Sequence, residues 1–136
     1  MAIANVTCVA IDGRGLLIEG PPGSGKSTLA LKLIDRGAML VGDDGVSLEL
    51  RDGRLWAAPP PHIAGKLEIR GVGIVDLPCT DAPAALSLNL AATAPRLPEL
   101  GSVEWLGKSI PQLAFVSRAP AAALRCEYAL ARFGIT

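Results

Sequence analysis

A glycine-rich segment at residues 20–27 contains the residue types that bind a phosphate group. It matches the pattern GxxxxGK[ST] and reads Gly20-Pro21-Pro22-Gly23-Ser24-Gly25-Lys26-Ser27. In this pattern the glycines let backbone N–H groups turn inward around a phosphate, the lysine reaches the β- and γ-phosphates, and the serine hydroxyl ligates Mg²⁺. The segment therefore predicts a nucleoside polyphosphate site. The expected nucleotide contacts are Gly20, Gly23, Ser24, Gly25, Lys26, Ser27 and Thr28.

Two adjacent acids, Asp43 and Asp44, form a second group with catalytic potential. They follow an apolar run at residues 38–41, which places them at the carboxyl end of a predicted strand, where α/β sheets usually carry their chemistry. One carboxylate can help to hold Mg²⁺ while the other takes a proton from an attacking hydroxyl. Gly-Asp-Asp-Gly is also ordinary turn chemistry, so spacing alone leaves an acidic turn as the alternative.

The flanking sequence predicts the strand and the helix that must position the glycine-rich segment. Residues 15–19 form a short apolar run bounded by glycines, which indicates a buried strand. Residues 27–36 carry apolar side chains at helical spacing, and Gly37 follows as a C-terminal stop. A strand before the segment and a helix after it are the context that phosphate binding requires.

The rest of the chain predicts many strands and one further helix. The expected strands are 3–11, 38–41, 46–50, 55–57, 67–76 with a glycine-permitted bend, 85–91, 103–106 and 110–116. Leucines at 86, 88 and 90 alternate, which favours a half-buried strand. The alanine-rich stretch 120–133 begins with proline and precedes Gly134, which is typical of a helix. The predicted fold class is α/β, with a mixed, heavily stranded sheet around the glycine-rich loop and its helix.

Length and composition limit the number of domains, the classes of binding partner and the cellular location that can be expected. The chain has 136 residues, half of them hydrophobic, so residues 1–136 are expected to form a single domain. Thirteen basic residues balance thirteen acidic ones, which leaves no net attraction to nucleic acid or to an anionic membrane. Neither a secretory signal nor a run long enough to span a bilayer is visible, so the expected location is the cytoplasm. The three cysteines show no metal-binding spacing and are expected to be small buried apolar residues.

These motifs, together with the segments LVGDD and LEIRGVGIVD, resemble the catalytic domain of the HPr kinase/phosphorylase family. The resemblance implies a P-loop nucleotide-binding domain similar to the one that this family shares with phosphoenolpyruvate carboxykinases. It implies an enzyme that uses Mg²⁺ and ATP, or pyrophosphate, to phosphorylate a serine of the phosphocarrier protein HPr in a phosphotransferase system. The reverse reaction is phosphorolysis with inorganic phosphate. A homo-oligomer is a further expectation, because family members oligomerise.

The resemblance also implies a role for individual residues. It gives catalytic roles to Lys26, Asp43, Glu68 and Arg70, and metal contact to Ser27 and Asp44. Asp43 becomes the general base that deprotonates the acceptor serine. Arg70 becomes a stabiliser of the transferring phosphoryl charge. Without the resemblance, Glu68 and Arg70 would be interpreted as a cross-strand surface pair. The basic residue Arg118 aligns with a loop at the reaction centre of the family.

The chain departs from the family pattern at three points. Asn5 stands where the family carries a histidine beside its general base, and asparagine cannot titrate. Thr28 stands where the family usually has an acid. Family members commonly carry a regulatory domain before the catalytic domain, and the resemblance implies that this chain is a short single-domain version without it. These departures leave two alternatives open: a catalytically impaired nucleotide-binding regulator, and a small-molecule kinase on the same scaffold. The sole histidine, His62, is interpreted as a solvated loop residue.

Overall fold

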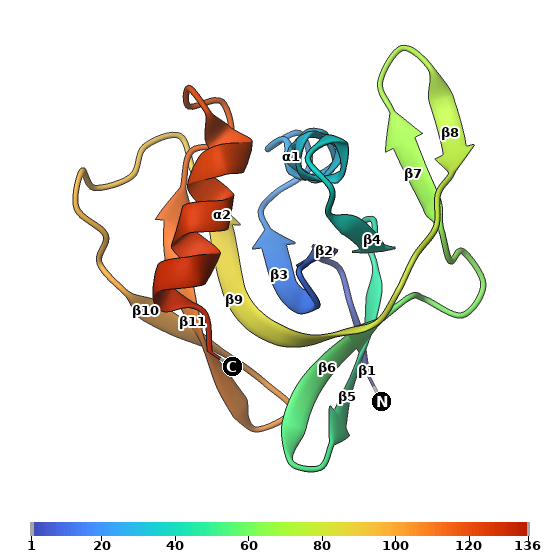
Figure 1. Cartoon of the computed structure of the whole chain (residues 1–136), viewed down its shortest axis with the longest axis horizontal. Coiled ribbons are helices and arrows are strands. Elements are labelled where there is room, and N and C mark those ends of the chain that lie inside the picture. The colour runs from blue at the N-terminus through green and yellow to red at the C-terminus, as the bar shows by residue number, and fades with distance from the viewer. Residues whose placement is uncertain (1, 136) are drawn as a thin grey trace.

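The computed structural model describes residues 2–135, and Figure 1 shows the arrangement of their elements. In chain order these are β1 (Ala2–Ala4), β2 (Thr7–Ile11), β3 (Arg14–Glu19), α1 (Lys26–Asp35), β4 (Met39–Gly42), β5 (Val46–Arg51), β6 (Arg54–Ala58), β7 (Lys66–Ile69), β8 (Gly73–Asp76), β9 (Ala82–Leu90), β10 (Gly101–Trp105), β11 (Lys108–Phe115) and α2 (Ala122–Phe133). Many strands and two helices were predicted, and this prediction is confirmed within the described residues.

The sheet is mixed, as predicted, and its centre is parallel. Strand β9 pairs in parallel with β3 on one side and with β11 on the other. Strands β2 and β4 extend the sheet beyond β3 by antiparallel pairing. The first residues of β9 pair with β6, which leads on to β5 and β1. The curve of β9 in Figure 1 therefore joins the two parts of the sheet.

Strand β3 is buried on both faces, which explains its continuous apolar sequence. Leu16 and Ile18 point to one side, where they pack with Leu29 and Leu33 of α1. Leu17 points to the opposite side and belongs to a second apolar cluster. Successive side chains of a strand alternate between faces, so one short strand contributes to both cores. This double burial fixes the end of β3 from which the glycine-rich loop starts.

The strand predicted at residues 85–91 is present as β9, but the prediction that it is half-buried was wrong. Strand β9 is buried on both faces along most of its length: Ala85 before its first leucine and Ser87 between two leucines are both fully buried. The reason is that β3 and β11 flank it and apolar clusters cover it. The hydroxyl of Ser87 remains satisfied, because it donates to the carboxylate of Glu19 and accepts from the amide of Gln112 at 3.1 Å. Small and polar residues between the leucines gave the misleading alternation.

The run predicted as one strand over residues 3–11 is divided in two. A bend at Asn5 separates β1, which pairs with β5, from β2, which pairs with β3 and β4. The chain thus passes from one part of the sheet to the other at this bend. Strands β2 and β3 form an antiparallel hairpin.

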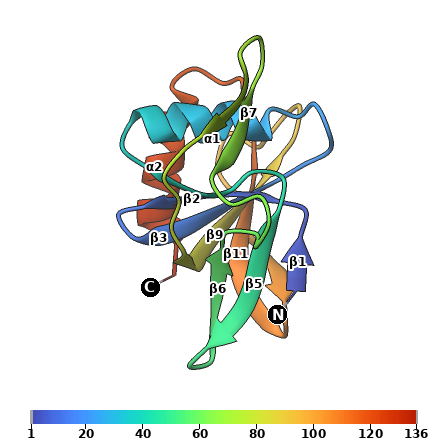
Figure 2. The ribbon, with the colours of Figure 1, turned by 90° about the vertical axis from the view of Figure 1, so that its right-hand side faces the viewer.

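The two helices and the β7–β8 hairpin surround the carboxyl end of β3. Arg36, just after α1, donates two hydrogen bonds of 3.0 and 2.9 Å to Glu127 of α2. The β7–β8 hairpin stands beside α1 and projects past it in Figure 2. Its base is fixed where the N–H of Leu77 donates to the carbonyl of Gly65 at 2.8 Å. No helix within residues 2–135 is long and apolar enough to cross a membrane.

The cysteine prediction is confirmed for two of the three residues. Cys8 and Cys126 are fully buried in the two apolar clusters, whereas Cys79 is partly exposed. Burial raises the pKa of the Cys126 thiol to about 12 and raises that of Cys8 further. Both therefore remain protonated and behave as small apolar residues.

Candidate active site

The glycine-rich loop joins β3 to α1 and directs the start of the helix toward solvent. Gly23 and Gly25 have φ angles of 80° and 99°, in the left-handed region that glycine adopts without strain. The N–H of Ser24 donates to the carbonyl of Pro21 at 3.1 Å and closes the turn. The first N–H groups of a helix have no partner within the helix, and they carry its positive end. This arrangement suits an anion at the amino end of α1.

Lys26 lies folded across the loop. Its ammonium group donates to the carbonyl of Gly20 at 2.8 Å and lies 3.5 Å from a carboxylate oxygen of Asp44. The Lys26 side chain is 12% exposed, whereas that of Asp44 is 71% exposed. The lysine charge is therefore held over the loop, between a backbone carbonyl and an acid at the surface.

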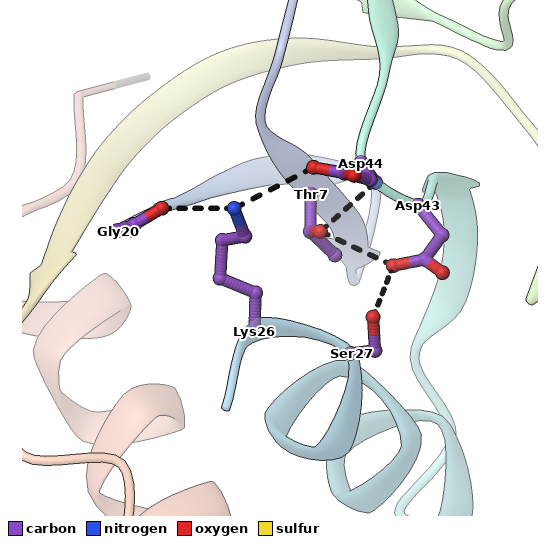
Figure 3. A network of polar contacts seen from close by, with 6 residues as sticks. All are labelled: Thr7, Gly20, Lys26, Ser27, Asp43 and Asp44. Atoms are coloured by element: carbon purple, nitrogen blue, oxygen red, sulfur yellow. Dashed lines mark hydrogen bonds and ion pairs between the residues drawn. The ribbon is translucent and has the colours of Figure 1, made fainter. Parts of the chain in front are cut away.

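Asp43 lies at the centre of a polar network that Figure 3 shows from close by. The hydroxyl of Ser27 donates to Oδ1 of Asp43 at 2.6 Å, and the hydroxyl of Thr7 donates to the same oxygen at 3.2 Å. The N–H of Asp44 donates to the Thr7 hydroxyl at 3.1 Å. Thr7 is fully buried in β2. The network thus ties the loop, the end of β4 and strand β2 together.

The segment Gly42–Gly45 is a tight turn as well as part of this network. Asp44 has a φ angle of 55°, which turns the chain sharply after Asp43. A Cβ atom at Gly42 would lie 2.2 Å from the carbonyl oxygen of Gly45 and 2.8 Å from Val46, so only glycine fits there. The turn sends the two acids to different partners, Asp43 to Ser27 and Asp44 to Lys26. The segment is therefore a tight turn that also places both acids beside the glycine-rich loop, so the two interpretations of Gly-Asp-Asp-Gly are compatible.

The β7–β8 hairpin contributes the third side of the site. The N–H of Glu68 makes a long hydrogen bond of 3.4 Å to Oδ2 of Asp43. The register of the hairpin pairs Glu68 with Ile74, so the alternative of a cross-strand pair between Glu68 and Arg70 does not fit. Both side chains line one cavity with the loop.

This first cavity has a volume of about 410 Å³. Its lining includes most of the predicted site residues: Gly23, Gly25, Lys26, Ser27, Thr28, Asp43, Asp44, Glu68 and Arg70. Two other predicted residues, Gly20 and Ser24, are not part of this lining. The carbonyl of Gly20 accepts the Lys26 hydrogen bond, and Ser24 lines a neighbouring cavity. Lysine and arginine side chains face carboxylates here, which is the combination that phosphoryl transfer needs.

Sequence reasoning missed three residues of the site. Thr7 gave no signal, because a threonine in a strand is ordinary and its partners are distant in sequence. Ser117 donates to the carbonyl of Ser24 at 2.8 Å and lines the cavity. Lys32 also lines it, and its position on α1 one turn beyond Thr28 was a usable signal. Arg118, suggested only by the resemblance, is part of the lining as well.

Two polar residues that drew attention in the sequence lie elsewhere. Asn5 is exposed at the bend between β1 and β2, and His62 is exposed in the turn that precedes Gly65. Within the described residues, the lining of the first cavity includes neither side chain. The interpretation of His62 as a loop histidine agrees with this position.

Fold and site together define a mixed α/β domain in which a glycine-rich strand–loop–helix segment lies opposite an acidic turn. The model of the family "HPr Serine kinase C-terminal domain" matches residues 2–80, which is more than half of the chain. The chain belongs to this family.

Individual relatives agree with this assignment. The HPr kinase/phosphorylase of Clostridium tetani is 47% identical over 70 residues, which cover 52% of this chain and 23% of that protein. The protein of the same name from Streptococcus thermophilus is 50% identical over 70 residues, with 51% and 23% covered. The match thus spans about a quarter of the length of these relatives. The solved Hpr(Ser) kinase/phosphatase from Coxiella burnetii superimposes with a TM-score of 0.86 at 28% identity, covering 96% of this chain and 89% of that one.

Proposed function

We propose that this protein is an ATP-dependent protein-serine kinase that also runs the reverse phosphorolysis, with an HPr-type phosphocarrier as its acceptor. The position of Asp43 is the main support for this proposal. Asp43 lies between the glycine-rich loop and the β7–β8 hairpin, with Oδ1 bonded to Ser27 and Oδ2 directed to the backbone of Glu68. An acid in this position can accept a proton next to the group that receives the phosphoryl.

The two oxygens of Asp43 differ in what they can accept. Oδ1 receives hydroxyl hydrogen bonds from Ser27 and Thr7, whereas Oδ2 has a single long contact with the N–H of Glu68. In the proposed reaction the acceptor serine gives its proton to Oδ2. The serine oxygen then bonds to the γ-phosphorus while the bond from that phosphorus to the β-phosphate oxygen breaks. In the phosphorolysis, an oxygen of inorganic phosphate bonds to the phosphorus of the phosphoserine while the bond from that phosphorus to the serine oxygen breaks, which releases pyrophosphate. The protonated carboxyl gives its proton to the serine oxygen as this bond breaks.

Positive side chains in the cavity support the transferring group. Lys26, Arg70 and Arg118 line it, and their charges oppose the charge that spreads over the phosphoryl oxygens. Because these groups come from α1, from the hairpin and from the segment after β11, the fold holds them before a substrate binds. Positioning and charge neutralisation of this kind supply most of the rate in phosphoryl transfer.

The residues fit Mg²⁺. The hydroxyl of Ser27 and the carboxylates of Asp43 and Asp44 are hard oxygen donors on one side of the loop, and Mg²⁺ is usually held by one or two carboxylates with substrate phosphates. When bound, the ion neutralises charge on the phosphates. Ser27 and the exposed carboxylate of Asp44 are the proposed metal contacts, whereas Asp43 remains the proposed base.

The proposal includes three further expectations from the sequence. Residues 1–136 are proposed to act as one catalytic unit. ATP is the proposed donor, and pyrophosphate is the alternative that the family resemblance adds. Both ATP and the carrier are cytoplasmic components, so we propose that the reaction takes place in the cytoplasm.

A second candidate function is a nucleotide-binding regulator without catalysis. It is favoured by Asn5, which occupies the family histidine position, is exposed and cannot titrate. A regulator of this kind would bind nucleotide and transfer nothing to a carrier.

Mass spectrometry of an HPr-type carrier tests both functions. The carrier is incubated with Mg²⁺, ATP and either the natural chain, the Asn5→His variant or the Asp43→Asn variant. A gain of one phosphoryl group on serine with the natural chain, absent with Asp43→Asn, is the expected result. Activity that requires Asn5→His would support the regulator. No transfer with either the natural chain or Asn5→His would overturn the kinase proposal for this acceptor.

A further inference from the structure

A second cavity lies beside the glycine-rich loop, and the roles proposed above leave its lining at residues 90–92 unused. Its volume is about 570 Å³, within the range of small-molecule pockets. Three segments form its lining: residues 21–24 of the loop, 90–92 after β9 and 116–118 after β11. In the sheet, β9 and β11 lie on one side of β3 while β2 and β4 lie on the other. The second cavity is therefore opposite Asp43, which follows β4.

The topology explains why these three segments meet. Strands β3, β9 and β11 are parallel neighbours, so their carboxyl ends share one edge of the sheet. Open α/β sheets bind ligands at this edge. The segments are also fixed to one another. The N–H of Ala91 donates to the carbonyl of Phe115 at 2.9 Å, and the hydroxyl of Ser117 donates to the carbonyl of Ser24 at 2.8 Å.

The two cavities are neighbours and differ in chemistry. Both are lined by Pro22, Gly23, Ser117 and Arg118, so they meet at the loop. The first cavity contains lysines, arginines and three carboxylates. In the second, Arg118 is the one charged residue among the described lining, and the remainder is mostly proline, alanine, leucine and valine. A ligand that filled both would carry a charged part joined to a largely apolar part.

Ser24, one of the residues that line the second cavity, has a buried hydroxyl without a partner within residues 2–135. The hydroxyl oxygen of Ser24 is buried and has no hydrogen-bond partner among the described residues. Ser24 is part of the lining of the second cavity. A buried hydroxyl without a partner costs free energy unless a bound group satisfies it.

We propose that the second cavity holds the nucleoside of the phosphoryl donor, with its phosphates extending across residues 22–26 into the first cavity. This inference rests on the proposed function in one respect, that the donor is a nucleoside triphosphate. The inference assigns the donor and the acceptor to opposite sides of the site. The base and ribose lie on the β9–β11 side, and the acceptor serine approaches from the side of Asp43 and Glu68.

Comparison of two ligands, Mg²⁺–ATP and Mg²⁺–tripolyphosphate, tests the inference by isothermal titration calorimetry. Tripolyphosphate carries the phosphates without the nucleoside. The double variant Ala91→Leu/Ala92→Leu adds bulk on both sides of one lining segment, since successive side chains of an extended chain point in opposite directions. The expected result is ATP affinity weakened by at least about tenfold, with tripolyphosphate affinity changed by less than about twofold.

Two control variants keep the outcomes separable. Ala94→Leu adds the same side chain to the same exposed loop, outside the lining of the second cavity, and leaves both affinities unchanged. Lys26→Met weakens both ligands, because it acts on the phosphates. The inference is overturned if the double variant binds ATP normally, or if it loses ATP and tripolyphosphate equally. It also fails if the natural chain binds tripolyphosphate as tightly as ATP, while the kinase proposal survives. Failure to bind either ligand would overturn the kinase proposal as well.

Discussion

The Ser27 hydroxyl and the Asp43 carboxylate lie 2.6 Å apart and share a hydrogen bond. Ser27 is in the first turn of α1, and Asp43 follows β4. They meet because α1 packs over the sheet in which β2 joins β3 to β4. The proposed metal contact and the proposed base are thereby linked directly. Movement of either one changes the position of the other.

Lys26→Met and Asp43→Asn are expected to separate binding from transfer. Loss of the lysine removes charged hydrogen bonds to the phosphates, so ATP affinity falls by about tenfold or more. Asparagine keeps the shape of Asp43 but accepts no proton. Asp43→Asn therefore lowers transfer by about 10²–10⁴-fold and leaves ATP affinity nearly unchanged. Titration calorimetry and carrier phosphorylation measure the two effects. Equal loss of ATP binding in both variants contradicts the assignment of Asp43 as the base.

Thr7→Val is expected to lower kcat more than it changes KM for ATP. Valine has the shape of threonine but lacks the hydroxyl that donates to Asp43 and accepts from the N–H of Asp44. The lost hydroxyl leaves a buried group without a partner and destabilises the fold by about 1–3 kcal/mol. Thr7→Ser restores the hydroxyl and serves as the control. If Thr7→Ser is as impaired in kcat as Thr7→Val, Thr7 has no role in positioning Asp43.

Gly42→Ala is expected to destabilise the protein, and Gly45→Ala is its matched control in the same turn. The added Cβ at Gly42 would lie 2.2 Å from the carbonyl oxygen of Gly45, whereas a Cβ at Gly45 has open space around it. Forced displacement of the turn costs about 1–3 kcal/mol and moves Asp43. Thermal unfolding compares the two variants. A similar melting temperature for both would show that the turn adapts.

Thiol labelling of the native protein at pH 8 is expected to modify Cys79 alone. Burial raises the pKa of Cys126 to about 12 and raises the pKa of Cys8 as well, so neither forms thiolate at this pH. Unfolding in guanidinium exposes all three thiols. Fast labelling of a second native thiol would contradict the burial of these residues.

The same pKa shifts predict a loss of stability in alkali. A thiol whose folded pKa is raised above its ordinary value of 9.0 keeps its proton in the folded chain and releases it on unfolding. The free energy of unfolding is therefore unaffected below about pH 9 and decreases as the pH rises from there toward about 12. Denaturation curves at pH 8 and pH 10.5, with Cys126→Ala as the control, measure this decrease. A decrease of the same size in that variant would assign it to other groups.

Local sequence was sufficient for the strand, loop and helix around Lys26. The apolar run before the loop and the helical spacing after it do not depend on distant contacts, and the structure has both elements within one residue of the predicted bounds. The hairpin at residues 67–76 was predictable for the same reason, because glycines mark its bend. The acidic turn was also visible as turn chemistry.

Features that depend on distant partners were not predictable. Thr7 and Ser117 reach the site only through pairing with strands far along the chain, and neither residue type stands out locally. The double burial of β9 arises from neighbours on both edges and both faces, while Ser87 looks like a surface residue in the sequence. Pairing of β1 with β5 likewise divided a run that appeared continuous.

The position of β9 has a consequence for the order of folding. This strand pairs in parallel with β3, so that Leu16 lies beside Leu86, and it also joins β6 and β11. A nascent chain that has emerged only to residue 80 contains the whole stretch matched by the family model, yet β3 still has one open edge. Such long-range pairing is slow to form. We expect the emerging chain to remain dependent on protection from aggregation until residue 90 has left the ribosome, because β3 gains its second neighbouring strand only then.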